Sequence, residues 1–339
     1  MSTEISPLIL EKAPLILAEI KKATSVLLHC HPSPDPDSVG SSLAMKFALE
    51  QMGKKVTLIR GDSIIPQAFM HFPGAKDIQE KSYLDIDPTL FDLFIILDTA
   101  DTGRVSSKGK VEFPATMRTV NIDHHSSNPD FAEINLVETM YPATAQILFD
   151  LFHEWKVKIT KEIAENLFIG IYTDTGGFKF RGATVRTFTI AAELVRSAPD
   201  FGKLIIDMQN SNTPEFITFQ ALALNSIETF YGQKLVISAV SYDDLIKKNI
   251  PPTETSSSAV SPILNTVIGW DINVALVEVA PGKVKCSLRT RDQDAYDVSK
   301  LASALGGGGH KAAAGATMMM PLPEAKKCVV QKAKDLYNL

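Results

Sequence analysis

Acidic and histidine side chains directly follow several apolar runs of this chain. The residues at these positions are His31, Asp35, Asp37, Asp98, Asp123, His124, His125 and Asp174. Carboxylates held close together repel each other and raise each other's pKa unless cations lie between them. Carboxylate and imidazole ligands without a thiolate favour Mn²⁺, with Mg²⁺, Co²⁺ or Zn²⁺ less favoured. These groups exceed one coordination sphere, so we predict two divalent metal ions, about 3.5–4 Å apart, that share one carboxylate.

The apolar runs have to be strands for these side chains to converge. The strand-like runs are 25–30, 55–62, 91–98 and 118–123. The helix-like runs are 38–53, 143–155, 160–174 (with Thr160 as N-cap) and 183–198. Continuously apolar strands with helices between them predict a parallel sheet covered on both faces. Ligands bind outside the edge where parallel strands end, so three strands and the end of a helix bring these residues together.

Each of these residues also has an ordinary structural interpretation. Asp37 alone is more typical of an N-cap for a helix that starts at Ser38. His31 alone is more often a loop histidine than a ligand, and Asp98 could begin a turn. Their combination, an acid or a histidine after each of three strands, favours a metal site.

The second half of the chain predicts a smaller α/β domain. Residues 199–230 have helical patterning, and a strand-like run follows at 233–241. The runs 272–280 and 283–291 form a hairpin around Pro281-Gly282, and the Ser/Thr-rich stretch 253–261 opens a helix.

Composition excludes several classes of protein. The chain has 339 residues, 45% of them hydrophobic, and a formal net charge of −5. It has no dominant Lys/Arg block, so long duplex nucleic acid is not an expected partner. The three cysteines lack CxxC spacing, which argues against a disulfide framework or a zinc knuckle. No apolar run approaches the roughly 18–20 residues that span a bilayer, so we expect no membrane association and a cytoplasmic location.

Six segments resemble a known family. The segments "HPSPDPDSVGS", "ILDTAD", "IDHH" and "YTDTGGF" resemble the motifs of the DHH phosphoesterases, and "CSLRTR" and "GGGGHKAAAG" resemble their DHHA1 substrate-binding domain. One departure is Pro36, where the family usually has glycine. The resemblance implies a catalytic domain at 1–200, a helical linker at 201–230 and a DHHA1 domain at 231–339, with a cleft between the two domains.

The resemblance also implies roles for individual residues. It places His31 and Asp35 on one metal ion, and Asp37, His124 and Asp174 on the other. It makes Asp98 the bridge between the ions. It leaves His125 near the substrate phosphate, with Asp123 orienting a neighbouring histidine. The catalytic residues it implies are therefore Asp98, Asp123 and His125.

The second domain is expected to bind the substrate. Arg289 and Arg291 alternate at the end of a strand, where they can grip a phosphate; the alternative is two solvated arginines. The run Gly306–Gly309 is not a Walker A loop, because it lacks the G-x-x-x-x-G-K-[ST] pattern. We expect Gly307, Gly308 and Gly309 to let the backbone approach an anion, with His310 and the N-terminus of a following helix as donors. A flexible connector or a helix C-cap is the alternative.

Family members with this domain pair resemble small-oligonucleotide phosphodiesterases, or nanoRNases. The resemblance implies hydrolysis of short RNA to 5′ mononucleotides by metal-activated hydroxide. It also leaves open 3′-phosphoadenosine 5′-phosphate and linear or cyclic dinucleotides as substrates. Two alternatives remain: an exopolyphosphatase or pyrophosphatase, and a non-catalytic nucleotide sensor. The N-terminal helix and the strand edges also leave a homodimer open.

Overall fold

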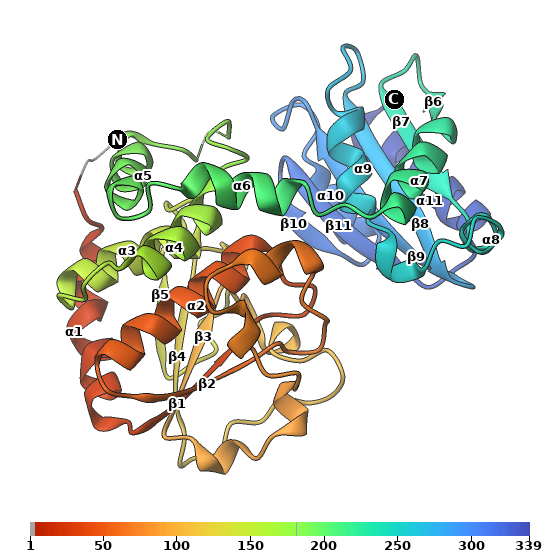
Figure 1. Ribbon diagram of the computed structural model, residues 1–339. Helices are drawn as coiled ribbons and strands as arrows, with labels where there is room; N and C mark the ends of the chain where they lie inside the picture. The colour runs from red at the N-terminus through yellow and green to blue at the C-terminus, as the bar shows by residue number, and fades with distance from the viewer. Residues whose placement is uncertain (1–3, 181) are drawn as a thin grey trace. The chain divides into compact units, whose positions relative to one another are not determined.

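The computed structural model describes residues 4–180 and 182–339 and divides into two compact units, Met1–Ser211 and Asn212–Leu339 (Figure 1). The helix at Phe201–Gln209 belongs to the first unit, and the helix at Pro214–Asn225 belongs to the second. The boundaries 1–200, 201–230 and 231–339 stay predictions.

The first unit is built on a parallel sheet, as its apolar runs predict. Its strands are β1 (Ser25–His29), β2 (Lys55–Ile59), β3 (Leu93–Leu97), β4 (Arg118–Asp123) and β5 (Ile134–Val137). They pair in the order β2-β1-β3-β4-β5, and every pairing is parallel. The edge strand β5 was not predicted, because its short run "INLV" carries little strand signal. The order reverses between β1 and β3, which is where ligands bind in open α/β sheets.

The two faces of this sheet have different cover. Its helices are α1 (Pro7–Lys22), α2 (Pro36–Gln51), α3 (Thr144–Glu154), α4 (Lys161–Asp174), α5 (Val185–Ser197) and α6 (Phe201–Gln209). Val26 and Leu28 of β1 pack into the core formed with these helices. Leu27 points to the other face, where it packs with Tyr83 and Phe94 under irregular segments that contain short 3₁₀ turns.

Close packing between α2 and α4 fixes the distance between two groups of candidate ligands, because α2 begins beside Asp35 and α4 ends on Asp174. A Cβ at Gly40 of α2 would come within 2.5 Å of the Asn166 carbonyl oxygen on α4. Glycine at this position lets the two helix backbones approach each other.

We therefore expect Gly40→Ala to destabilise the protein. Alanine favours a helix by about 1 kcal/mol, but the contact with a backbone carbonyl forces the helices apart, for a net loss of about 1–3 kcal/mol. Gly202→Ala in α6 is the matched control, since a Cβ there meets no heavy atom within 4 Å and should stabilise by roughly 0.5–1 kcal/mol. Denaturant unfolding measures both, and equal effects would contradict the packing argument.

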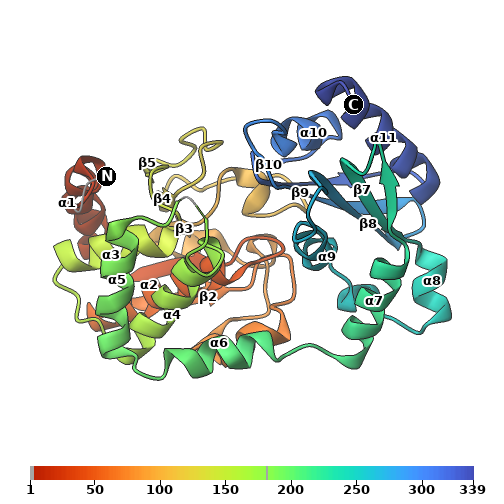
Figure 2. The same ribbon diagram turned by 90° about the horizontal axis from the view of Figure 1, so that it is seen from above.

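The second unit contains a mixed sheet between two layers of helices (Figure 2). Its strands are β6 (Glu228–Phe230), β7 (Leu235–Val240), β8 (Ile272–Ala280), β9 (Lys283–Thr290), β10 (Gly308–His310) and β11 (Ala313–Met318), in the order β10-β11-β9-β8-β7-β6. The helices are α7 (Pro214–Asn225), α8 (Tyr242–Lys247), α9 (Ser257–Leu264), α10 (Val298–Ala304) and α11 (Leu322–Tyr337). The cores place α10 and α11 on one face and α7 to α9 on the other. The predicted hairpin around Pro281-Gly282 and the helix within 253–261 are confirmed.

The glycine run enters a β-hairpin, so the helix expected after it is wrong. β10 pairs with β11, and Gly309 lies opposite Ala314. A Cβ at Gly307 would fall 2.1 Å from the Gly315 carbonyl oxygen, and Gly309 has a φ of +140°. Glycines at alternate positions allow the two strands to pair this closely. The alanines of "KAAAGA" predicted a helix because local propensity alone was considered.

Among the helices in the described part of the chain, none is both long enough and apolar enough to cross a membrane.

Candidate metal centre

His31 follows β1, and one of its ring nitrogens already has a hydrogen-bond partner. Its Nδ1 lies 3.0 Å from the Pro32 carbonyl, which can only accept, so in the neutral ring Nδ1 carries the proton and Nε2 has the lone pair. The His31 backbone N–H donates to Ser38 Oγ at 3.1 Å, which ties the end of β1 to the start of α2. The side chain is 1% exposed. This fixed tautomer suits a metal ligand.

Asp35, rather than Asp37, is the N-cap of α2. Its Oδ1 accepts a hydrogen bond from the Ser38 backbone N–H at 2.9 Å, so the N-cap interpretation of Asp37 is wrong. The other oxygen of Asp35, Oδ2, lies 3.6 Å from His31 Nε2. The cap therefore leaves one carboxylate oxygen of Asp35 directed at the imidazole.

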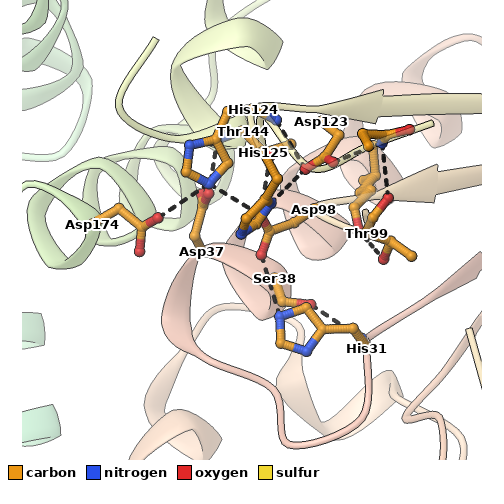
Figure 3. Close-up of polar contacts among 12 residues, drawn as sticks. His31, Asp37, Ser38, Asp98, Thr99, Asp123, His124, His125, Thr144 and Asp174 are labelled. Atoms are coloured by element: carbon orange, nitrogen blue, oxygen red, sulfur yellow. Dashed lines mark hydrogen bonds and ion pairs between the residues drawn. The ribbon is translucent and has the colours of Figure 1, made fainter. Parts of the chain in front are cut away.

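Asp98 lies between two groups of side chains (Figure 3). It follows β3 with a φ of +51°, a backbone conformation that is uncommon for residues other than glycine. Its Oδ2 lies 3.3 Å from His31 Nε2, and its Oδ1 lies 3.4 Å from His124 Nε2. Thr144 also donates its hydroxyl to Oδ1, at 3.2 Å. The two oxygens of one buried carboxylate thus face two different imidazoles.

Asp37 is fully buried beneath the N-terminus of α3. Its Oδ2 accepts from the Thr144 backbone N–H at 2.7 Å, and its Oδ1 accepts from the Ala145 N–H at 3.0 Å. The N-terminus of a helix stabilises negative charge at this position. α4 packs just as tightly on the other side, since a Cβ at Gly170 would come within 2.6 Å of Asp37 Oδ1. Sequence reasoning missed this contact because Asp37 and Thr144 are far apart in the chain.

His124 and His125 leave β4 in different directions. His124 Nε2 lies 3.4 Å from Asp174 Oδ2, beside α4. His125 Nδ1 instead lies 2.7 Å from Asp123 Oδ1, so Asp123 holds the orientation of the ring.

Asn128 supports Asp123 and was not singled out from the sequence. Its Nδ2 donates to Asp123 Oδ2 at 2.7 Å and lies 2.7 Å from Asn121 Oδ1. Asn121 in turn donates to the backbone carbonyls of Ile96 and Thr99. The amides of half-buried Asn128 and buried Asn121 therefore anchor the Asp123–His125 pair to the sheet. Only the spacing of "DHHSSN" offered a signal for this contact, and that signal was weak.

The predicted residues gather in overlapping sets whose ligand atoms lie within 4.8 Å of one another. The sets are His31, Asp35 and Asp98; Asp37, His124 and Asp174; and Asp98, His124 and His125. Imidazole nitrogens and carboxylate oxygens, mostly buried and pointing at each other, are the donors that divalent metal ions take in proteins. The cluster fits the binding of divalent metal ions.

Two carboxylates of this cluster, Asp37 and Asp174, have pKa values above the ordinary range. Burial raises the pKa of Asp37 to about 7, and the neighbouring Asp98 adds to the shift. Burial also raises the pKa of Asp174 well above its ordinary value, with Asp37 adding repulsion. Such shifts indicate negative charge that needs a counter-charge.

The imidazoles supply that counter-charge when no metal ion does. Burial lowers the pKa of His31 and His124, but their acidic neighbours outweigh it and raise these values to about 9 and about 10. Burial raises the pKa of Asp98, but its contacts with the two imidazoles outweigh that and lower it well below the usual range. Protons and divalent ions therefore compete for the same atoms.

The predicted substrate-binding residues lie in the second unit. Arg289 is on β9, and its Nη1 donates to the Leu288 carbonyl at 2.9 Å; burial lowers the pKa of its guanidinium. Both Arg289 and His310 lie opposite Ala313 in the register of adjacent strands, so their side chains share one face of the sheet. Arg291 follows β9 and is exposed, and its Nη1 donates to the Val267 carbonyl at 3.0 Å. Gly308 faces open space, whereas Gly307 and Gly309 are pressed against β11.

Both units match known domains. Residues 25–171 match the DHH family, N-terminal domain, and residues 232–338 match the DHHA1 domain. The chain is 30% identical over 323 residues to the bifunctional oligoribonuclease and PAP phosphatase NrnA of Thermus thermophilus, an alignment that covers 94% of this chain and 93% of that protein.

Solved structures show the same fold. An exopolyphosphatase-related protein from Bacteroides fragilis superposes with a TM-score of 0.85 at 21% identity and covers 97% of each chain. RecJ from Thermus thermophilus, in complex with Mn²⁺, superposes with a TM-score of 0.52 at 14% identity over 98% of this chain and 56% of that one. Together with the His/Asp cluster, the domain matches define a phosphoesterase, which is a hydrolase. The chain belongs to the DHH family of phosphoesterases that carry a DHHA1 domain.

We expect the metal-free protein to lose stability as the pH rises. When folded, Asp37 and Asp174 keep protons that the unfolded chain releases near pH 4, and His31 and His124 keep protons that it releases near pH 6.5. The folded state binds more protons than the unfolded state over this range, so the free energy of unfolding falls from about pH 5 to about pH 9. Metal ions replace these protons, so stabilisation by Mn²⁺ should grow with pH.

Thermal unfolding with a chelator and with saturating Mn²⁺, between about pH 6 and about pH 8.5, measures this difference. Asp98→Asn should abolish most of the Mn²⁺ effect. If Mn²⁺ raised the melting temperature by the same amount at every pH, the proposed competition between protons and metal ions would be contradicted.

Asn128→Ala should lower kcat by about 10- to 100-fold, because it loosens the carboxylate that orients His125. KM and bound metal should change little, since Asn128 lies in none of the metal-ligand sets. Asn128→Ser keeps a hydroxyl donor and should recover part of the rate, while exposed Ser127→Ala serves as the control. Steady-state kinetics together with metal analysis test this role. Loss of metal in Asn128→Ala would make Asn128 a structural support of the cluster instead.

Proposed function

We propose that this phosphoesterase hydrolyses short oligoribonucleotides to 5′ mononucleotides and also accepts 3′-phosphoadenosine 5′-phosphate. The observation that carries the proposal is Asp98, whose two oxygens face separate imidazoles and so suit a carboxylate shared by two metal ions. The substrate class is supported by the 30% identity to an oligoribonuclease and PAP phosphatase over nearly the whole chain.

In this proposal, His31 and Asp35 hold one ion, Asp37, His124 and Asp174 hold the other, and Asp98 contacts both. Manganese is the proposed metal, with Mg²⁺ or Co²⁺ as substitutes; the mixed oxygen and nitrogen donors and the Mn²⁺ complex of RecJ support it. Such ions acidify a bound water for attack on phosphorus and neutralise charge on the phosphoryl oxygens.

The protein's own groups then position the substrate. His125, held at Nδ1 by Asp123, presents Nε2 to the phosphate. The second unit supplies Arg289, Arg291 and His310 for the rest of a short substrate. Gly306 and Gly308 leave room for an anion beside the backbone, since a Cβ at either would meet no heavy atom within 4 Å. The cleft between the domains and a homodimer stay predictions.

Product analysis tests the function directly. Mn²⁺-loaded protein should release 5′ mononucleotides from 5′-phosphorylated di- to pentaribonucleotides and phosphate from 3′-phosphoadenosine 5′-phosphate. Asp98→Ala should lower both rates by roughly a thousandfold or more, because the shared carboxylate is lost. Asp243→Ala, an exposed acid in the second unit, is the control and should retain activity.

The alternatives give different results in the same assay. Faster hydrolysis of polyphosphate or pyrophosphate than of any oligonucleotide would replace the proposal with a polyphosphatase. Tight dinucleotide binding without any released product would make the protein a nucleotide sensor.

A further inference from the structure

An aromatic side chain, Phe180, lies in the loop that directly follows Asp174 at the end of α4. The loop folds back on the helix end just after Asp174: the Gly177 backbone N–H donates to the Tyr172 carbonyl at 2.7 Å. The Phe180 N–H donates to the carbonyl of Thr175 at 3.0 Å, and Thr175 is the residue after Asp174. These bonds fix the position of Phe180 relative to the Asp174 carboxylate.

Phe178 and Phe180, two residues apart in this loop, have different environments. The ring of Phe178 packs on Phe188 at a centroid distance of 5.1 Å and on Tyr172 at 5.9 Å. The side chain of Phe180 is 59% exposed. The distal end of its ring lies over Gly176, where a Cβ would come within 2.5–2.8 Å of Cζ, Cε1 and Cε2. The glycine supports part of the ring without a side chain of its own, and the remainder faces solvent.

Exposure alone would carry no inference, because single exposed apolar residues are common on protein surfaces. The location is what indicates a ligand. The carboxylate of Asp174, at the start of this loop, lies 3.4 Å from His124 Nε2. The Phe180 ring lies over Gly176, two residues after Asp174, so we expect it within reach of the base of a nucleotide whose phosphate is bound at the cluster. Every base can stack on an aromatic ring, which suits the proposed hydrolysis of short oligoribonucleotides.

We propose that Phe180 is a stacking platform for the base of the nucleotide whose phosphate lies at the His/Asp cluster. This inference rests on the proposed function and deepens it. It makes Phe180 a specificity-determining residue, which distinguishes nucleotides from base-free phosphates within the catalytic domain.

Binding of a matched pair of ligands tests the platform. Adenosine 5′-monophosphate and ribose 5-phosphate share the sugar phosphate and differ in the base. Calorimetry of the Mn²⁺-loaded protein should show tighter binding of the nucleotide. Phe180→Ala should weaken nucleotide binding by roughly 5- to 100-fold and leave ribose 5-phosphate binding unchanged. Phe180→Trp should retain the preference.

Leu90→Ala is the matched control. Leu90 is 70% exposed in the first unit but precedes β3, so it lies toward the opposite edge of the sheet from Asp98. It should change neither affinity. The fluorescence of 2-aminopurine riboside 5′-monophosphate should be quenched on binding to the wild type, through stacking, and much less on binding to Phe180→Ala.

Two results would overturn the platform. One is unchanged nucleotide affinity in Phe180→Ala. The other is a shift of Phe180→Ala from dimer to monomer in sedimentation with unchanged nucleotide affinity, which would show that a second copy of the chain covers the ring.

The platform and the proposed function can fail separately. If oligonucleotides are cleaved but Phe180→Ala leaves their KM unchanged, only the platform fails. If Phe180 selects the nucleotide but no oligonucleotide is cleaved, the platform stands and only the function fails.

Discussion

The structure of the catalytic unit depends on repulsion between carboxylates that are buried within a few ångströms of one another. Asp37, Asp98 and Asp174 are brought together from three distant segments, and burial removes the water that would screen their charges. The protein compensates in part with His31 and His124, which face the two oxygens of Asp98. Divalent cations complete this compensation, so the same electrostatic problem that makes the cluster costly to fold makes it selective for metal ions.

Holding such a cluster requires rigid supports, and each carboxylate has a different one. Asp37 accepts hydrogen bonds from two backbone N–H groups at the start of α3. Asp35 caps α2 with one carboxylate oxygen, and its other oxygen faces His31. Asp98 takes an uncommon backbone conformation directly after β3. Strained residues of this kind cost about 1–3 kcal/mol and persist only where surrounding contacts determine them. Close packing of α2 on α4, through Gly40, sets the spacing between the two sides of the site.

The second unit shows how one local feature can serve two purposes. The close antiparallel pairing of β10 with β11 requires Gly307 and Gly309, because a Cβ at either position would clash with the neighbouring strand. That hairpin then places His310 and Arg289 on the same face of the sheet, on either side of Ala313. The glycine run is therefore explained first by the local backbone, and its proposed part in substrate binding rests on the side chains that the hairpin brings into register.

The sequence by itself determined the class of this protein and most of its site. Apolar runs that end on acids or histidines predict parallel strands with ligands at one edge, because strand periodicity and the edge rule act locally. The tertiary structure alone decided which of Asp35 and Asp37 caps α2, and that Thr144 and Asn128 support the cluster. It also decided that β5 extends the sheet and that the segment "KAAAGA" leads into strand β11. These outcomes depend on contacts between segments far apart in the chain, and such contacts leave no local pattern and can override propensity.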